Sequence, residues 1–208
     1  MIRIFHGARE LGTSGLVDDM HRDRKRIFVD LLKWEVPVID GDYEIDQFDT
    51  DAAVYLVAAG PDGEHRGSIR LLPTNGDHIL GSIFPGLCDQ PVPRSPRIYE
   101  ISRGCLSPRL RAPERREVRN ALTTAAVQYA MMHGIWSFTC IADAGWLRQI
   151  LSLGWDCRAL GASRRIGRAM TGALRIDITT GTLDQLQEAG SYRSLPLALA
   201  DLPEKVAA

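Results

Sequence analysis

The side chains best suited to chemistry near the N-terminus are charged residues that lie close to large aromatic ones. Arg24 and Phe28 are four residues apart, so they share one face of a predicted helix, and Trp34 follows. Three acids come next: Glu44, Asp46 and Asp49. This pattern of charges next to large aromatic side chains makes the segment a candidate functional site. The alternative explanation is an amphipathic helix with a solvated arginine and core aromatic residues.

Further charges lie inside segments that are otherwise apolar. Arg70 lies in one predicted strand, and Glu100, Ser102 and Arg103 lie in the next. Charges are costly to bury unless they are paired, so these residues are candidates for a buried site. The alternation of side chains along a strand predicts Glu100 and Ser102 on one face and Arg103 on the other. An ion pair on an edge strand is the alternative explanation.

Several common catalytic motifs are absent from the sequence. It has no G-x-G-x-x-G loop after a strand, no Walker loop, no Ser-His-Asp set and no zinc-binding H-E-x-x-H helix. Residues 164–169 loosely match an acetyltransferase pyrophosphate loop, but they follow the third predicted helix, so we interpret them as a basic turn. The four cysteines form no C-x-x-C pair, which predicts reduced thiols and no metal site.

The composition excludes several classes of protein. The chain has 208 residues, 45% hydrophobic and 25% charged, with a formal net charge of -1. These values are ordinary for one globular domain, so we predict a single domain (1–208) that does not bind nucleic acid. Residues 1–6 are typical of a strand, not of a signal peptide, and no apolar run has membrane-spanning length. We therefore expect a cytoplasmic protein without a membrane anchor.

The order of the elements predicts an α/β fold. Strands are predicted at 1–6, 53–59, 65–72, 98–106, 136–142, 155–160 and 172–179. Helices are predicted at 15–33, 114–132 and 144–153, with a short helix and tail in 182–208. Residues 73–96 are predicted as a long functional loop. This order predicts an α/β/α sandwich with a mixed central sheet, which is also the layout of N-acetyltransferase-like folds.

Taken together, these motifs resemble the N-acyl-homoserine-lactone synthase (autoinducer synthase) family. The family pattern is R-x-x-x-F-x-x-x-x-x-W, then E-x-D-x-x-D, an arginine in R-L-L-P-T, a phenylalanine, and E-x-S-R. The matching residues are Arg24, Phe28, Trp34, Glu44, Asp46, Asp49, Arg70, Phe84, Glu100, Ser102 and Arg103. The resemblance covers roughly residues 1–180 in the same order and spacing.

The resemblance implies an acyltransferase with two bond-forming steps. The amine of S-adenosylmethionine attacks an acyl thioester, and its carboxylate then closes a lactone and expels methylthioadenosine. S-adenosylmethionine is thus a substrate, and no cofactor or metal is expected. The implied catalytic residues are Glu100, Arg70, Arg103 and Asp46. We expect Glu100 to be the base, held ionised by Arg103 without a raised pKa, and a backbone N–H in 101–106 to be the oxyanion donor.

The resemblance also implies three sets of binding residues. S-adenosylmethionine would contact Arg24, Phe28, Trp34, Asp46, Asp49, Arg70, Phe84, Ser102 and Arg103. The acyl pocket would be lined by Phe138, Cys140, Ile141, Trp146, Leu147 and Ile150, which indicates a short, branched or aryl group. The acyl donor, an acyl carrier protein or coenzyme A, would dock on Arg109, Arg111, Arg115, Arg116 and Arg119.

Family members that make 3-oxo-acyl products tend to have a threonine in the strand after the long helix. Cys140 aligns with that threonine, and a shift of the alignment by one residue would place Thr139 there instead. Core packing is an alternative for Trp34 and for the acyl-pocket residues, and a solvated basic face is the alternative for the five arginines. Two other functions stay open. One is an N-acetyltransferase that uses acetyl-CoA and another amine acceptor, and the other is a non-enzymatic signal-binding module.

Overall fold

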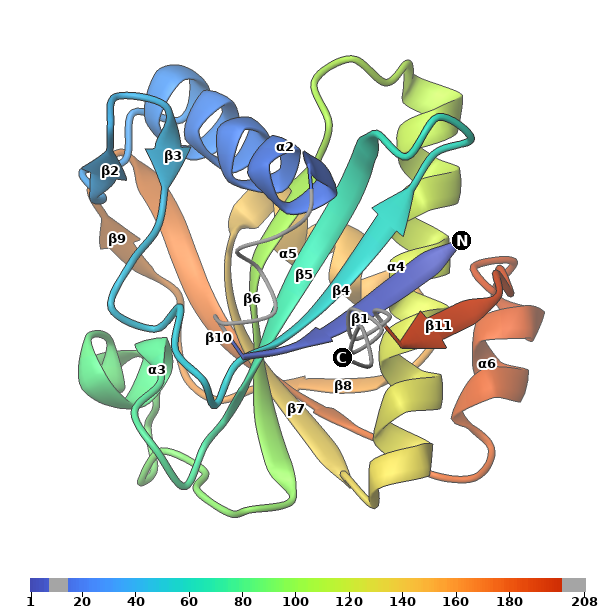
Figure 1. Cartoon of the computed structure of the whole chain (residues 1–208). Coiled ribbons are helices and arrows are strands. Elements are labelled where there is room, and N and C mark those ends of the chain that lie inside the picture. Colours follow the sequence, from blue (N-terminus) through green and yellow to red (C-terminus); the bar gives the residue numbers. More distant parts are fainter. Residues whose placement is uncertain (8–14, 200–208) are drawn as a thin grey trace, which may run out of the picture.

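The core of the molecule is one mixed β-sheet of nine strands in the order β11-β1-β4-β5-β6-β7-β10-β8, with β9 paired to β10 (Figure 1). The computed structural model describes residues 1–7 and 15–199. The sheet strands are β1 (Ile2–His6), β4 (Val54–Ala59), β5 (His65–Pro73), β6 (Ile98–Leu106), β7 (Ser137–Asp143), β8 (Asp156–Ala159), β9 (Arg164–Ile166), β10 (Ala169–Asp177) and β11 (Leu197–Leu199). The β1–β11 and β6–β7 pairs are parallel and the other pairs are antiparallel.

Helices cover both faces of the sheet (Figure 1). They are α2 (Gly15–Arg24), α3 (Ile79–Ser82), α4 (Ala112–His133), α5 (Ala144–Leu151) and α6 (Thr182–Glu188). Alternation along β4 separates two cores: Leu56 packs with residues of α4, whereas Tyr55 and Val57 pack with residues of α2. This is the three-layer α/β/α arrangement that the sequence predicts.

Three segments differ in detail from the expected elements. The predicted helix 15–33 ends as α2 at Arg24 and continues as a π-helix, η1 (Lys25–Leu31). Such wider turns are often found at functional sites, and this one carries Phe28. The predicted loop 73–96 contains α3 and a 3-10 turn, η2 (Pro85–Leu87). The remaining differences are short strands: the hairpin β2 (Val38–Ile39) and β3 (Tyr43–Glu44), and β11 in the predicted tail, whose last residues lie outside the described part.

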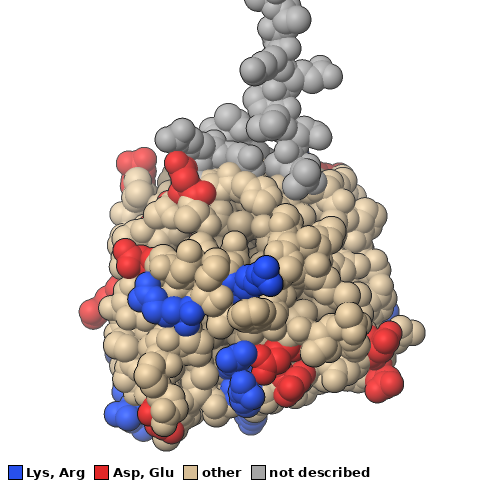
Figure 2. Space-filling model, turned by 90° about the horizontal axis from the view of Figure 1, so that it is seen from below, with Lys and Arg blue, Asp and Glu red and all other residues tan. Residues whose placement is uncertain are grey.

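On the face in Figure 2, positive and negative side chains are interspersed among uncharged ones and do not form a patch of one sign. Within residues 1–7 and 15–199, no helix is both long enough and apolar enough to cross a lipid bilayer.

The C-terminal end of α4 gives a prediction about stability. Gly134 ends this helix with φ at +65°, in the left-handed region that side chains with a Cβ atom disfavour. Gly134→Ala should destabilise the protein by about 1 kcal/mol and lower its melting temperature by about 2–4 °C. Gly134→Asn is the matched control, because asparagine tolerates this conformation and should cost less. Equal melting temperatures for Gly134→Ala and the unchanged protein would contradict the assignment of this helix end.

Candidate functional site

Six charged side chains from distant parts of the chain meet in one buried cluster beside the sheet. They are Arg24, Arg70, Arg103, Glu44, Asp46 and Asp49, and we call them the charge cluster. Three arginines face three carboxylates, so their formal charges cancel. The arginines come from α2, β5 and β6, whereas the acids all come from the segment that begins at β3. The structure thus brings together the charged motifs that the sequence distributes over 80 positions (24 to 103).

Arg24 and Arg70 bind the acids through several hydrogen bonds each. Arg24 donates from Nε to Glu44 at 2.6 Å and from its two Nη atoms to Asp49 at 2.9 and 2.8 Å. Arg70 donates to both oxygens of Asp46 at 2.6 and 3.0 Å, and its Nη1 lies 2.8 Å from Asp49. Such paired, charge-assisted contacts fix the planes of both groups. Glu44 belongs to the family motif, but its place between Arg24 and Arg103 becomes clear only in the structure.

Arg103 corrects the expectation from strand alternation. Its φ is +50°, and the β5–β6 register shifts between Ser68 and Arg70 opposite it, so its side chain does not follow the regular pleat. The guanidinium donates to Glu44 Oε1 at 2.9 Å and lies 2.5 Å from Asp46 Oδ2. Arg103 therefore joins the same cluster as Arg70, to which Ser102 is also hydrogen-bonded.

The arginines determine the ionisation of the cluster acids. Burial by itself would raise the pKa of Asp46 and Asp49, but the neighbouring guanidinium groups reverse this and hold both pKa values below the ordinary range. Tyr55 donates its hydroxyl to Asp49 at 2.9 Å, and burial raises the pKa of that phenol. No sequence pattern singles out Tyr55, because its strand is uniformly apolar on either side of it.

Glu100 lies beside the cluster, in a different environment. Its Oε1 accepts from the backbone N–H of Ile79 at 2.9 Å, and its Oε2 accepts from that of Leu80 at 2.7 Å. Burial raises its pKa to about 7, although these two amide groups and the more distant Arg70 and Arg103 favour the carboxylate. The expectation that Arg103 would keep this pKa low was therefore wrong, because Arg103 is bound to Glu44 and Asp46.

The aromatic residues form a stacked pair at the edge of the cluster. The rings of Phe28 and Trp34 lie 4.9 Å apart at an angle of 8°, and the Arg103 guanidinium lies 5.5 Å from the centre of the Phe28 ring. Phe28 is buried, but Trp34 is 43% exposed, which is incompatible with core packing. Phe84 is half-buried and packs near Leu80.

The parallel pairing of β6 with β7 decides between the two candidates for the threonine position. Glu100 pairs with Thr139, and Ile101 pairs with Cys140. Paired residues share a face of the sheet, so Thr139 lies on the side of Glu100, and Cys140 packs in the core on the α4 side. The Thr139 hydroxyl is buried without a hydrogen-bond partner among the described residues. Of the two candidates, Thr139 is therefore the one that lies on the side of Glu100.

The predicted acyl-pocket residues divide between the two faces of the sheet. Five belong to, or pack against, the core under α4 and α5: Phe138, Cys140, Trp146, Leu147 and Ile150. Only Ile141 packs on the other face, near Leu80 and Ala173. The β6–β7 pairing stops at Ile101 and Cys140, beyond which β6 pairs with β5 only. The two faces therefore meet at the point where these strands separate.

Three of the five predicted docking arginines bind groups of this chain, and the other two are exposed. Arg109 donates to Asp23 at 3.1 and 2.9 Å, Arg115 donates to the Ser107 carbonyl, and Arg119 binds Asn120 and Gln149. Arg111 and Arg116 are exposed at the start of α4.

The start of α4 does not form an open phosphate loop. Glu114 accepts from the Arg111 N–H at 2.9 Å and from Arg66 at 2.8 Å, so a carboxylate of the chain occupies this helix end. The basic stretch at 164–169 contains the predicted turn, at Gly167, but its first three residues form the strand β9, which was not predicted.

Comparison with known proteins identifies the family. The family model described as autoinducer synthase matches residues 9–186. The chain belongs to the autoinducer synthase family. An acyl-homoserine-lactone synthase from Ralstonia nicotianae is 33% identical over 175 residues, covering 81% of this chain and 85% of that relative. The predicted family is thus confirmed, and the chain is an acyltransferase of the acyl-homoserine-lactone synthase class.

Solved structures agree with the family and the fold. BjaI, a CoA-dependent acyl-homoserine lactone synthase, superposes with TM-scores of 0.85 with MTA and 0.83 with SAM and isopentyl-CoA. It is 26% identical, and the match covers 98% of this chain and 94% of BjaI. A Lactobacillus plantarum protein described as an N-acetyltransferase has a TM-score of 0.54 at 17% identity, covering 86% of this chain and 99% of that one. That likeness concerns the fold alone, and it confirms the N-acetyltransferase-like class.

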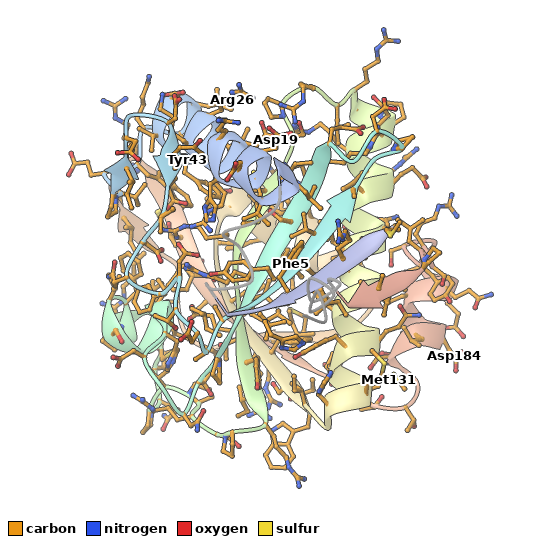
Figure 3. The ribbon with its side chains drawn as sticks, in the orientation of Figure 1. Phe5, Asp19, Arg26, Tyr43, Met131 and Asp184 are labelled. Atoms are coloured by element: carbon orange, nitrogen blue, oxygen red, sulfur yellow. The ribbon has the colours of Figure 1, made fainter. Side chains whose placement is uncertain are left out.

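The balance of charge in the cluster gives a second prediction. Asp49→Asn should destabilise this synthase by about 3–5 kcal/mol, because Arg24 and Arg70 would lose a charged partner in a buried place. Asp19→Asn is the control: Asp19 lies on the outer side of α2 (Figure 3), 3.7 Å from Arg22, and should cost less than about 1 kcal/mol. Denaturant unfolding measures both.

The same measurement has an expected pH dependence. The pKa of Asp49 is lowered in the folded state, so its stabilisation is complete above 3.8, the ordinary value, and is lost as the pH falls through the folded value. The stability difference between the Asp49→Asn variant and the unchanged protein should therefore shrink in acid. A difference below about 1 kcal/mol at neutral pH would show that the cluster does not stabilise the fold.

Proposed function

We propose that this synthase joins an acyl group to S-adenosylmethionine through Glu100, with the charge cluster and the Phe28–Trp34 pair as the S-adenosylmethionine site. The product is an N-acyl-L-homoserine lactone, a quorum-sensing signal, and methylthioadenosine is released. The observation that carries the proposal is a buried carboxyl group with a pKa of about 7 beside a neutral charge cluster and a stacked aromatic pair of which Trp34 is exposed. An ordinary N-acetyltransferase is less well supported, because the sequence has no glycine-rich phosphate loop before α4.

In this proposal the aromatic pair binds the cation. The stacked Phe28 and Trp34 rings, with Phe84 nearby, cover the adenine and the sulfonium by stacking and cation–π contact. The cluster acids are already paired with arginines, so they do not carry free charge for the ligand. Asp46 and Asp49 act mainly by orienting Arg70 and Arg24, which leaves Arg103 and Ser102 to direct the methionine carboxylate.

The first step needs a neutral amine and a group that accepts its proton. A free α-amino group has a pKa of about 8, so a base with a pKa near 7 is well matched to it. The amine nitrogen attacks the thioester carbonyl carbon, Glu100 accepts the proton directly or through one water, and the carbon–sulfur bond breaks to release the carrier thiol. A backbone N–H in 101–106 is the proposed oxyanion donor.

The second step is intramolecular, and positioning provides most of its rate enhancement. The methionine carboxylate oxygen attacks the γ-carbon of the same molecule, which closes the lactone as the carbon–sulfur bond of the sulfonium breaks. Methylthioadenosine leaves as a neutral molecule, so no further acid is required. The role of the protein is to fold the methionine chain so that oxygen and carbon meet.

The acyl chain is placed where β6 and β7 separate. From Glu100 it would pass Thr139 and Ile141 and reach Phe138 and Trp146 on the α5 side. The unpaired Thr139 hydroxyl can donate to an oxygen at the 3-position of the chain. The donor, an acyl carrier protein or coenzyme A, would dock on the exposed Arg111 and Arg116.

We further propose that the reaction takes place in the cytoplasm, where the substrates are made. All four cysteines are free thiols, as is usual in that reducing compartment.

The aromatic pair gives a third prediction. Trp34→Ala should weaken S-adenosylmethionine binding by on the order of 1–3 kcal/mol and leave acyl-donor binding nearly unchanged. Trp136→Ala is the matched control, because Trp136 is also exposed and also lies near an arginine, 5.8 Å from Arg97. Calorimetric titration measures both affinities. Unchanged S-adenosylmethionine affinity in a folded Trp34→Ala variant would remove the pair from the site.

Glu100 gives a fourth prediction, on pH dependence. Glu100→Gln keeps the shape of the side chain but removes the base, so acylation should fall by roughly 100-fold or more at neutral pH. Raising the pH should recover part of the loss, because more amine becomes neutral without help. Release of methylthioadenosine, measured beside a melting curve, tests this.

Two other outcomes would contradict the assignment. If Glu100 has a structural role only, Glu100→Gln should be poorly folded and higher pH should not restore activity. If the variant is stable and fully active at neutral pH, Glu100 is not the base. Glu64→Gln is a control for the loss of one carboxylate, because Glu64 lies in the turn between β4 and β5, away from the cluster.

A further inference from the structure

The short helix α3 is the element that binds the carboxylate of Glu100. The N–H groups of Ile79 and Leu80, the first two residues of α3, each donate to a different oxygen of that carboxylate. Both hydrogen bonds favour the ionised form, in opposition to burial. The position of one helical turn thus controls how strongly the proposed base holds a proton.

Among the described residues, the buried ring of His78 has a hydrogen-bond partner at only one of its two nitrogens. His78 immediately precedes α3, is fully buried, and has Nδ1 3.0 Å from the Gly76 carbonyl oxygen. A carbonyl only accepts, so Nδ1 carries the hydrogen. Burial lowers the pKa of His78, which keeps the ring neutral, and Nε2 has no partner among the described residues. A hydrogen bond at Nε2 therefore does not explain the position of the His78 ring.

Gly81 explains how the ring fits. A Cβ atom on Gly81 would lie 2.5 Å from Cε1 and 2.7 Å from Nε2 of His78, which is closer than real Cβ atoms approach other atoms. The ring therefore packs against the bare backbone of α3. Any side chain at position 81 would require either the ring or the helical turn to move.

We propose that His78 and Gly81 are positioning residues that hold the first turn of α3 where its two amide groups bind both oxygens of Glu100. The hydrogen bond to the Gly76 carbonyl holds the His78 ring in place, and the ring packs against the first turn of α3 and fixes the position of that turn. The inference rests on the proposed role of Glu100 as the base. It assigns a role in the reaction to two residues that do not belong to the charged motif of the family.

The other groups near Glu100 are held by contacts that do not involve α3. Arg70 on β5 and Arg103 on β6 favour the carboxylate, and both are held by Asp46. On β7, the Thr139 hydroxyl is uncharged, and burial raises the pKa of the Cys140 thiol so that it stays neutral. A change in the pKa of Glu100 caused by a substitution in α3 therefore reports on the amide groups.

The test compares Gly81→Ala with a double variant in which a smaller side chain at position 78 makes room for the new Cβ atom. Gly81→Ala should displace α3, weaken one or both amide hydrogen bonds and move the acidic limb of the pH–rate profile up by about one unit, with activity preserved at high pH. In the double variant His78→Asn/Gly81→Ala, the shorter asparagine and the new Cβ together occupy the space of the ring, and asparagine can still donate to Gly76, so the turn stays held without a clash. The limb should then return at least halfway. Gly86→Ala is the matched control, because no atom lies within 4 Å of a Cβ there.

Two additional measurements separate the possible failures. Infrared difference spectra record the protonated carboxyl band that is absent from Glu100→Gln, so they follow this titration without any turnover. His78→Ala removes the ring that packs against α3 and introduces no clash. It should therefore raise the pH midpoint of the carboxyl band, even if Gly81→Ala does not fold. If the unchanged protein forms no lactone from S-adenosylmethionine and acyl thioesters, the proposed function fails, and the infrared midpoints still test the positioning.

Three results would overturn the inference. The first is an unmoved limb and infrared midpoint in a folded Gly81→Ala variant. The second is an equal shift in Gly81→Ala and in the double variant, which would show that the clash is not with His78. The third is a loss of activity by the same factor at every pH, which would indicate a structural role only.

Discussion

The buried pairing of three arginines with three carboxylates is the constraint on which the site depends. Each arginine touches two of the acids, so removing any member leaves an uncompensated charge in a largely buried place. The segment that carries Glu44, Asp46 and Asp49 has only a two-residue hairpin of its own. Its position is therefore determined by guanidinium groups that project from α2, β5 and β6.

A neutral cluster beside the proposed base has a chemical consequence. A net positive cluster would hold Glu100 ionised and weakly basic, and a net negative one would keep it protonated at neutral pH. Because the charges cancel, burial and two amide groups determine the pKa instead, and it lies close to that of the amine substrate. In the proposed mechanism the site thus separates two tasks: the cluster orients the ligand, and α3 tunes the base.

Much of the fold follows from residue patterns, and the exceptions have local causes. Apolar strands and the long helix α4 appear where the hydrophobic periodicity predicts them, because burial of an apolar face decides these elements. The side chain of Arg103 was assigned to the wrong face, since a bulge and a left-handed φ are not visible in an alternating pattern. The prediction that the pKa of Glu100 is not raised was wrong, because its partners are the backbone N–H groups of Ile79 and Leu80, which cannot be predicted from residue types.

The charged motif itself could be recognised from the sequence, but its contacts could not. The spacing of Arg24, Arg70 and Arg103 shows that they are needed, whereas only the topology shows which acid each one meets. The choice between Cys140 and Thr139 likewise depended on the register of β6 against β7. A register is a property of two strands together, so it cannot be obtained from either strand alone.

The separation in sequence between the partners of the charge cluster also bears on how the molecule matures. Its contacts join residues 20 to 59 positions apart, and the arginines they use come from a helix and two strands that must first pack together. Contacts of this kind form after local ones during folding. In the proposed mechanism, a chain whose sheet is incomplete therefore lacks the cluster that orients the methionine part of S-adenosylmethionine, and only fully folded copies of this enzyme can make the signal.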